Sequence, residues 1–213
     1  MASDPTDTLR DLLRDLLRDP AAPMVAIADL LDNADAEHRR AALHALNRRQ
    51  QRALYERAAT SPLLTLTDLV PATTPPLTAV IHHGKNSLPL FRDFQKHMCR
   101  PDDTSARVYG YNEGITRPFI GPGYFVAYQT GAATDGTRDW AARGGVVVDY
   151  CQLPQTAVTP RWPPLVANDV GLQRFVFRGM RDFLRRVSTH ASIGAAWQGE
   201  VEFNSWFILC RDP

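Results

Sequence analysis

The residues best able to do chemistry gather between Tyr109 and Tyr124, where aromatic, amide, acidic and basic side chains occur in a segment rich in glycine. Glu113 and Arg117 can pair with each other or face a ligand, and Asn112 directly precedes Glu113. Connections between neighbouring strands are usually about 2–5 residues long, and longer ordered loops often carry function. We therefore take this segment as the leading candidate for a site. A hairpin shaped by glycine and proline, with packed aromatic residues, is the alternative.

A second candidate is the short stretch from His83 to Ser87, between an expected strand and an expected helix. It offers backbone N–H groups at a helix N-terminus, a capping side chain at Asn86 and one cation at Lys85. This combination predicts a pocket for a small anion or a carboxylate. The alternative is an ordinary turn capped by Asn86 or Ser87.

Catalysis by a general base is a further possibility. His83 or Glu113 would accept the proton, and Arg117 would stabilise the developing negative charge. A thiol nucleophile at Cys151 is the weaker candidate, because the sequence has no G-x-S-x-G turn and free cysteines are more often buried small hydrophobes. The sequence leaves open whether the protein is an enzyme.

The histidines and cysteines predict no metal site. His82 and His83 are adjacent, so on a strand they point to opposite faces. His97 and Cys99 lie on different sides of a helix if the segment is helical. The chain also has no C-x-x-C or H-x-x-x-H spacing.

The elements that position these residues fall into two parts. Residues 1–62 form a helical N-terminal segment, with expected helices at 8–18, 24–31 and 34–59, where leucine and alanine recur at helical spacing. Residues 63–76 are rich in proline and threonine, which is typical of a linker. We place the domain boundary there.

Residues 77–213 predict an α+β domain. Strands are expected at 77–83, 107–111, 124–130, 145–153, 191–198 and 204–211, and helices at 89–98 and 169–189. This order reads as two β-α-β-β units with one helix each, which would form a mostly antiparallel sheet. It is similar to the order in domains of the bacterial gyrase-inhibitor and haem-binding SOUL-type proteins. That resemblance implies a duplicated ligand-binding fold.

Composition narrows the setting of the protein. The net charge of +1 predicts neither nucleic-acid binding nor attraction to an anionic membrane. Three widely spaced cysteines and the absence of an apolar leader favour a reducing, cytoplasmic location. The basic residues are 22 arginines and 2 lysines. One explanation is GC-rich codon usage in a bacterial-type genome; the alternative is selection of arginines that bind anions.

Three hypotheses follow. The first is small-molecule binding by a pocket on the sheet, with the ligand and any cofactor unknown. The second is the general-base enzyme described above. The third is an interaction protein that forms a homo-oligomer through its N-terminal helices. For the first hypothesis the expected binding residues are His83, Lys85, Asn86, Tyr111, Asn112, Glu113, Arg117, Tyr124 and Trp197, where the aromatic residues form the apolar walls.

Overall fold

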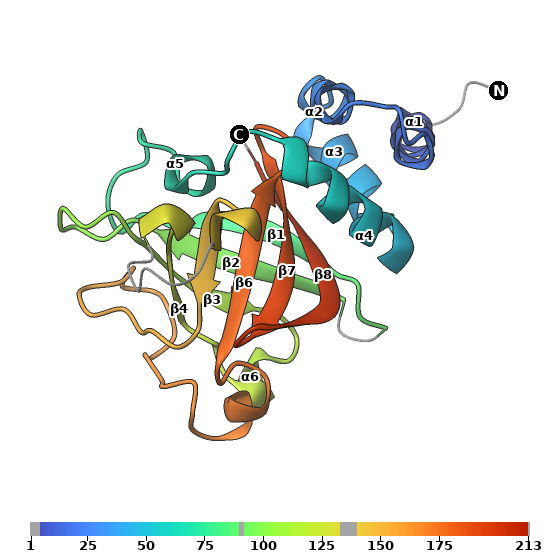
Figure 1. Cartoon of the computed structure of the whole chain (residues 1–213). Helices are drawn as coiled ribbons and strands as arrows, with labels where there is room; N and C mark the ends of the chain where they lie inside the picture. Colours follow the sequence, from blue (N-terminus) through green and yellow to red (C-terminus); the bar gives the residue numbers. More distant parts are fainter. Residues whose placement is uncertain (1–4, 90–91, 133–139, 213) are drawn as a thin grey trace.

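The computed structural model of the protein describes residues 5–89, 92–132 and 140–212. Eight strands form one closed barrel in which each strand pairs antiparallel with the next, and the last strand pairs with the first (Figure 1). The strands are β1 (Val80–Asn86), β2 (Asp93–Cys99), β3 (Val108–Glu113), β4 (Phe125–Gln129), β5 (Val146–Asp149), β6 (Met180–Arg186), β7 (Ala191–Gln198) and β8 (Val201–Arg211).

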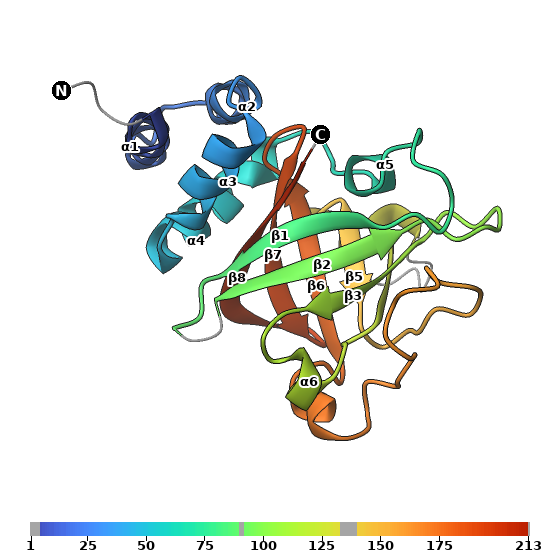
Figure 2. The same cartoon turned by 180° about the vertical axis from the view of Figure 1, so that it is seen from behind.

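The α-helices lie outside the barrel. In the described residues they are α1 (Pro5–Arg18), α2 (Met24–Asp32), α3 (Ala36–His44) and α4 (Arg48–Arg57), and the short helices α5 (Leu66–Leu69) and α6 (Arg117–Ile120). Of these α-helices, α1 to α4 form a group at one side of the upper end of the barrel, and α5 and α6 lie near opposite ends of the barrel (Figures 1 and 2).

The expected open sheet of two β-α-β-β units is wrong, because the strands form a closed barrel. In the described part of 89–98, β2 takes the place of the expected helix, and residues 90–91 lie outside the described residues. The expected helix at 169–189 is replaced by a short 3₁₀ turn followed by β6. Apolar residues at helical spacing suggested both helices. In the barrel the side chains alternate instead, so Lys96 on β2 and Asp182 on β6 occupy inward positions that sequence patterns usually assign to apolar residues. The closed barrel also contradicts the expected resemblance to the duplicated ligand-binding domains.

The expectation of a helical N-terminal segment is confirmed, although its third helix is divided in two. α3 ends at His44, and Asn47 begins α4 by accepting a hydrogen bond from the backbone N–H of Gln50 at 3.0 Å. The Asn47 backbone N–H in turn donates a hydrogen bond to Oε1 of the Gln50 side chain at 2.9 Å, which completes a capping box. This cap stops the chain from continuing as one long helix. The predicted domain boundary at 63–76 stays a prediction.

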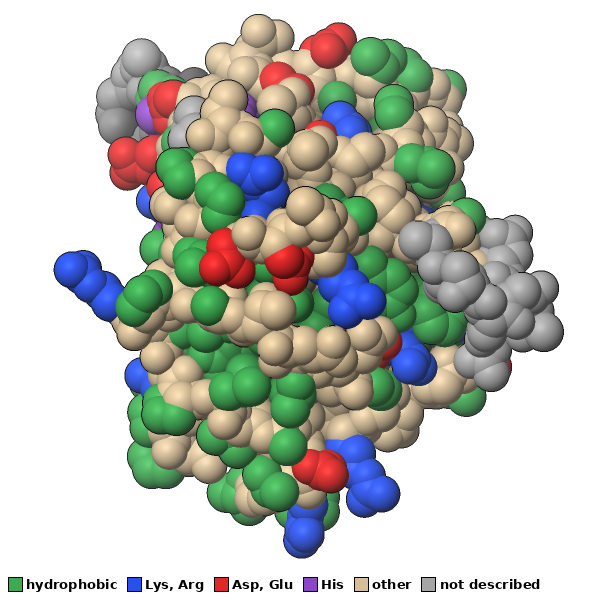
Figure 3. Space-filling view, turned by 90° about the vertical axis from the view of Figure 1, so that its left-hand side faces the viewer, with side chains coloured by type: hydrophobic (Ala, Val, Ile, Leu, Met, Phe, Trp, Pro, Cys, Tyr) green, Lys and Arg blue, Asp and Glu red, His purple; other side chains and the backbone are tan. Residues whose placement is uncertain are grey.

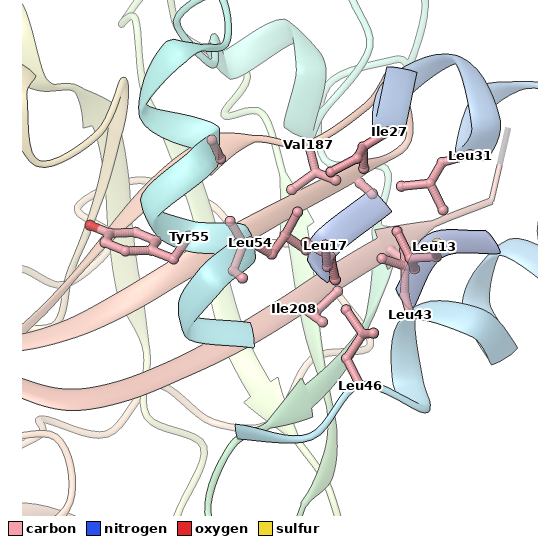
Figure 4. Packing of buried hydrophobic residues seen from close by; sticks show 14 of the residues in the cluster. Leu13, Leu17, Ile27, Leu31, Leu43, Leu46, Leu54, Tyr55, Val187 and Ile208 are labelled. Atoms are coloured by element: carbon pink, nitrogen blue, oxygen red, sulfur yellow. The ribbon is translucent and has the colours of Figure 1, made fainter. Parts of the chain in front are cut away.

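Leucines of the helices are buried against the outer face of β7 and β8 (Figure 4). Leu13 of α1 and Leu54 of α4 are completely buried, in a cluster that includes Ile193 of β7 and Ile208 of β8. Helices as short as α1 are marginal alone in water, so this packing is what stabilises them. In the described part of the chain, no helix is long and apolar enough to cross a membrane.

One end of the barrel is covered by the segment that contains α5. Leu69 lies in the hydrophobic cluster of the barrel interior, and its carbonyl oxygen is 2.9 Å from Nε2 of the buried His82. Asp68 forms an ion pair with Arg186 of β6, and its carbonyl accepts a hydrogen bond from Nε of Arg211 at 3.0 Å. These contacts tie α5 to β1, β6 and β8. The opposite end, near α6, holds the candidate site.

Candidate ligand-binding site

A cavity of about 490 Å³ opens at the α6 end of the barrel. Its walls come from β1, β2, β3, β6, β7 and β8, from the segment 113–121, and from residues 176–177 before β6. Ligand pockets in proteins are typically about 300–1,000 Å³, so this volume suits one small molecule. An eight-stranded barrel is wide enough inside for a single ligand of that size.

Four polar side chains meet in the cavity. Nζ of Lys96 donates hydrogen bonds to Oδ1 of Asn112 at 2.9 Å, to Oδ2 of Asp182 at 3.3 Å and to the hydroxyl of Tyr150. That hydroxyl in turn donates to Oδ2 of Asp182 at 3.1 Å. The four residues come from β2, β3, β6 and the turn directly after β5, and the cavity reaches all of them. We call Lys96, Asn112, Tyr150 and Asp182 the polar cluster.

Aromatic rings surround the ammonium group of Lys96. The centroids of the Phe94, Phe125 and Phe207 rings lie 5.6, 5.0 and 5.2 Å from its Nζ atom, and the Tyr150 ring lies at 5.1 Å. A cation at this distance from a ring is attracted to its electron-rich face. Aromatic surface therefore lies around the Lys96 end of the polar cluster.

The positions of three of these rings depend on glycines that point into the barrel. A Cβ atom added to any of these glycines would overlap the facing ring. The glycine and ring pairs are Gly84 with Phe94, Gly110 with Phe125, and Gly194 with Phe207. Because glycine has no side chain, each ring can lie against the backbone and reach the surroundings of Lys96.

Burial shifts the proton affinities of the polar cluster. Burial lowers the pKa of Lys96 and raises the pKa of Asp182, and in each case the other member of the pair opposes the shift. The two pKa values are therefore closer together than those of a lysine and an aspartate in water. Burial also raises the pKa of Tyr150 well above its ordinary value, so its hydroxyl keeps its proton and remains a hydrogen-bond donor.

The mouth of the cavity has an apolar rim made of Leu88, Ile115, Val176 and Phe203, all of which are exposed. Ile115 is 79% exposed. Figure 3 shows hydrophobic side chains gathered at the lower end of the molecule, the end at which Figure 1 places α6. An apolar ligand that enters here passes apolar surface before it reaches the polar cluster.

Four of the residues expected from the sequence line this cavity: Asn86, Asn112, Glu113 and Arg117. Asn112 belongs to the polar cluster, whereas Glu113 lies near the mouth and pairs with Arg117 at 2.7 Å. The segment 109–124 contains β3 from Tyr109 onward, α6 and the turn before β4. The leading candidate segment thus borders the cavity through side chains of β3 and α6.

His83 and Lys85 do not line the cavity. Both lie within β1 (Val80–Asn86), so a strand occupies the place of the helix N-terminus that was expected to bind an anion. Lys85 pairs with Asp93 at 3.2 Å. His83 and Glu113 both border a shallow outer groove, but Nε2 of His83 lies 3.9 Å from Asp212, while Glu113 is bound to Arg117. The general-base hypothesis stays a prediction.

The three expected aromatic wall residues pack elsewhere. Tyr111 and Tyr124 lie in contact with each other, with ring centroids 5.7 Å apart, and both pack against Trp162. Trp197 packs against Phe183 on another side, with the guanidinium of Arg143 4.0 Å from its ring centroid. None of these tyrosines or Trp197 is among the residues that line the cavity.

Sequence reasoning missed Lys96, Tyr150 and Asp182. The alternation of side chains along the strands could have revealed Lys96 and Asp182. On β2, Phe94, Lys96 and Met98 share one face. On β6, Met180, Asp182 and Leu184 do so. A lone charged residue between apolar residues at a spacing of two marks a strand whose inner face carries a polar group.

Among the described residues, no group of three or more His, Cys, Asp or Glu side chains is placed to hold a metal ion. His82 points to the barrel interior near Leu69, whereas His83 points outward. The three cysteines are free; Cys99 and Cys210 are buried, and Cys151 is exposed just after β5.

The fold and the site together define an up-and-down, eight-stranded β-barrel with an internal cavity and a helical cover on one side. The chain matches no protein-family model, no curated protein and no solved structure.

Proposed function

We propose that this protein binds a small, largely apolar molecule inside the barrel, with an oxygen-bearing group of that molecule directed at the polar cluster. One observation carries the proposal: an open cavity of ligand size has apolar and aromatic walls and a compact set of hydrogen-bonding groups at one place. Sites for small molecules usually combine a mostly apolar surface with a few polar groups that fix the orientation.

The orientation follows from the chemistry of the walls. Phe94, Phe177 and Phe207 offer apolar surface to a hydrocarbon body. Lys96 and Tyr150 carry N–H and O–H groups that can donate to a carbonyl, carboxylate or hydroxyl oxygen of the ligand. A ligand without any polar group would leave Lys96 and Tyr150 with the hydrogen bonds that they make within the polar cluster.

The proposal is tested by blocking the cavity. Ala196 of β7 lines the cavity, and an Ala196→Trp variant fills part of the space beside the polar cluster. The matched control is Ala59→Trp, because Ala59 is exposed and outside the cavity. Binding of a polarity-sensitive dye, anilinonaphthalene sulfonate, and its displacement by decanol are measured by fluorescence for the wild type and both variants.

We expect saturable dye binding that decanol displaces in the wild type and in Ala59→Trp, and weakened binding in Ala196→Trp. Equal binding in all three proteins would place the dye elsewhere and would contradict the proposal. Circular dichroism of the three proteins shows that any loss of binding is not a loss of the fold.

The other expectations from the sequence are not tested by the structure. A cytoplasmic location, the absence of nucleic-acid and membrane partners, and a homo-oligomer formed through the helices all stay predictions. Three of the α1 leucines that suggested an oligomer, Leu9, Leu13 and Leu17, are buried in the cluster formed with the protein's own helices and strands, whereas Leu12 is exposed.

A further inference from the structure

The placement of the lysines in this chain is unusual. The sequence has 22 arginines and only 2 lysines, Lys85 and Lys96. Lys85 pairs with Asp93 at the barrel surface, whereas Lys96 is 2% exposed and lies in the cavity. Arginine keeps its charge in proteins and offers no free amine, whereas a buried lysine can lose its proton and act as a nucleophile. Nearly every other basic position in this chain is an arginine, so the lysine at this buried position points to the chemistry of a primary amine.

We propose that Lys96 forms a Schiff base with an aldehyde or ketone held in the barrel cavity. This inference rests on the proposed binding of a small apolar molecule, and it narrows the oxygen-bearing group of that molecule to a carbonyl. Lysine amines form such adducts with carbonyl compounds when they are activated by a desolvated site.

The geometry supplies the nucleophile and the groups that move protons. Nζ of Lys96 lies 3.3 Å from Oδ2 of Asp182, which can accept a proton from it. The Tyr150 hydroxyl contacts both Nζ and Oδ2, so it can pass protons between the carboxyl group and an oxygen bound in the cavity. Asn112 holds Nζ through its Oδ1 atom, while its own Nδ2 is fixed to the carbonyl oxygen of Gly123 at 2.9 Å.

The proton affinities support the same step. Because burial lowers the pKa of Lys96 and raises the pKa of Asp182, moving a proton from the ammonium to the carboxylate costs less than it does in water. The product of that transfer is a neutral amine beside a neutral carboxylic acid. Desolvation favours this neutral pair, because both side chains are buried.

The reaction is balanced without any further reagent. After the proton moves to Asp182, Nζ attacks the carbonyl carbon, the C–N bond forms, and the π electrons of the C=O bond move to oxygen. Asp182 returns its proton to that oxygen, directly or through Tyr150. The nitrogen then gives a second proton to Asp182, which passes it to the hydroxyl group. The C–O bond breaks, water leaves, and the nitrogen lone pair forms the C=N bond.

The resulting protonated imine replaces the ammonium ion as the partner of Asp182. Its positive charge lies among the same aromatic rings, whose centroids are 5.0 to 5.6 Å from Nζ. The charges of the site are therefore the same before and after the reaction, and the adduct needs no new counter-ion.

The test uses decanal as the probe and borohydride as the trap. Borohydride reduces a protonated imine to a stable secondary amine, so the adduct is measured by intact mass and located by peptide mapping. Besides the amino terminus, Lys96 and Lys85 are the only amines with which decanal can form such an adduct. The variants are Lys96→Arg, Lys96→Met and the matched control Lys85→Arg.

We expect a single decyl adduct on Lys96 in the wild type and in Lys85→Arg, and its loss in both Lys96 variants. Mapping of the wild-type protein locates the adduct even if a Lys96 variant fails to fold. An adduct confined to Lys85 or the amino terminus would overturn the inference.

Decanol separates this inference from the proposed function, because it is an alcohol and cannot form an imine. If decanol displaces the dye but decanal leaves no adduct on Lys96, the Schiff base is overturned and the binding function stands. If decanol does not displace the dye and no adduct forms on Lys96, both proposals are overturned.

Discussion

Nζ of Lys96 and Oδ2 of Asp182 lie 3.3 Å apart inside the barrel, although the two residues are 86 positions apart in the chain. β2 and β6 do not pair with each other, so the contact crosses the barrel interior. A buried ion pair is costly to break from one side only, because the remaining charge has no partner.

This pair predicts a specific pattern in a double-mutant cycle. Asp182→Asn leaves Lys96 without its carboxylate and should lower the free energy of unfolding by about 3–5 kcal/mol. Adding Lys96→Met removes the unpaired charge, so the double variant should be more stable than Asp182→Asn alone. Urea denaturation measures all three. Strictly additive losses would show that the two side chains do not interact.

His82 predicts a pH dependence of stability. Burial lowers its pKa from 6.5 to about 4, so between these values the unfolded chain binds a proton that the folded chain does not. The contribution of the neutral His82 to the free energy of unfolding is therefore complete above pH 6.5. It decreases as the pH falls towards 4, by at most about 3 kcal/mol.

The measurement for His82 is the urea midpoint at neutral and mildly acidic pH. We expect His82→Gln to reduce the decrease in midpoint on acidification. If His82→Gln shows the full decrease, His82 is not responsible for it.

Two adjacent leucines test the packing of the helical cover. Leu13 is completely buried and Leu12 is 49% exposed, although both belong to α1. Leu13→Ala should lower the free energy of unfolding by about 2–5 kcal/mol, because it leaves a cavity in the cluster against β7 and β8. Leu12→Ala should cost less than about 0.5 kcal/mol. Equal costs in urea denaturation would mean that α1 does not pack as described.

Two glycines test the aromatic surroundings of Lys96. A Cβ atom at Gly110 would overlap the Phe125 ring and lie 2.6 Å from the carbonyl oxygen of His97, whereas a Cβ atom at Gly131 meets nothing within 4 Å. We expect Gly110→Ala to lower the thermal midpoint, at a cost of about 1–3 kcal/mol. Gly131→Ala should leave the midpoint nearly unchanged. A thermal midpoint of Gly110→Ala equal to that of the wild type would contradict the placement of Phe125.

The sequence predicted the helical segment, but it failed at the two strands that hold the polar pair. At β2 and β6, Lys96 and Asp182 interrupt the apolar alternation, so helical spacing became the stronger pattern. The closure of β8 on β1 depends on contacts between distant strands, which local patterns do not encode. The error in the fold and the missed site therefore have the same cause.

Part of the candidate site could be predicted from the sequence because its residues lie close together in the chain. Asn112, Glu113 and Arg117 belong to one local segment whose composition was unusual, and the cavity borders that segment. Tyr111 and Trp197 were assigned to the sheet face from alternation alone, and the barrel places them on its outside. Closure of the sheet decides which face becomes the barrel interior. If the wrong face is chosen, the residues assigned to the interior are those that lie on the outside.

The most direct test of binding inside the barrel uses methyl NMR of protein labelled at its four methionines. Met180 lines the cavity, and Met24 lies in the cluster beneath the helices. During titration with decanol, the account predicts a saturable shift of the Met180 methyl signal and an unchanged Met24 signal. A saturable shift of Met24 with an unchanged Met180 signal would show binding under the helices and would contradict a ligand site in the barrel.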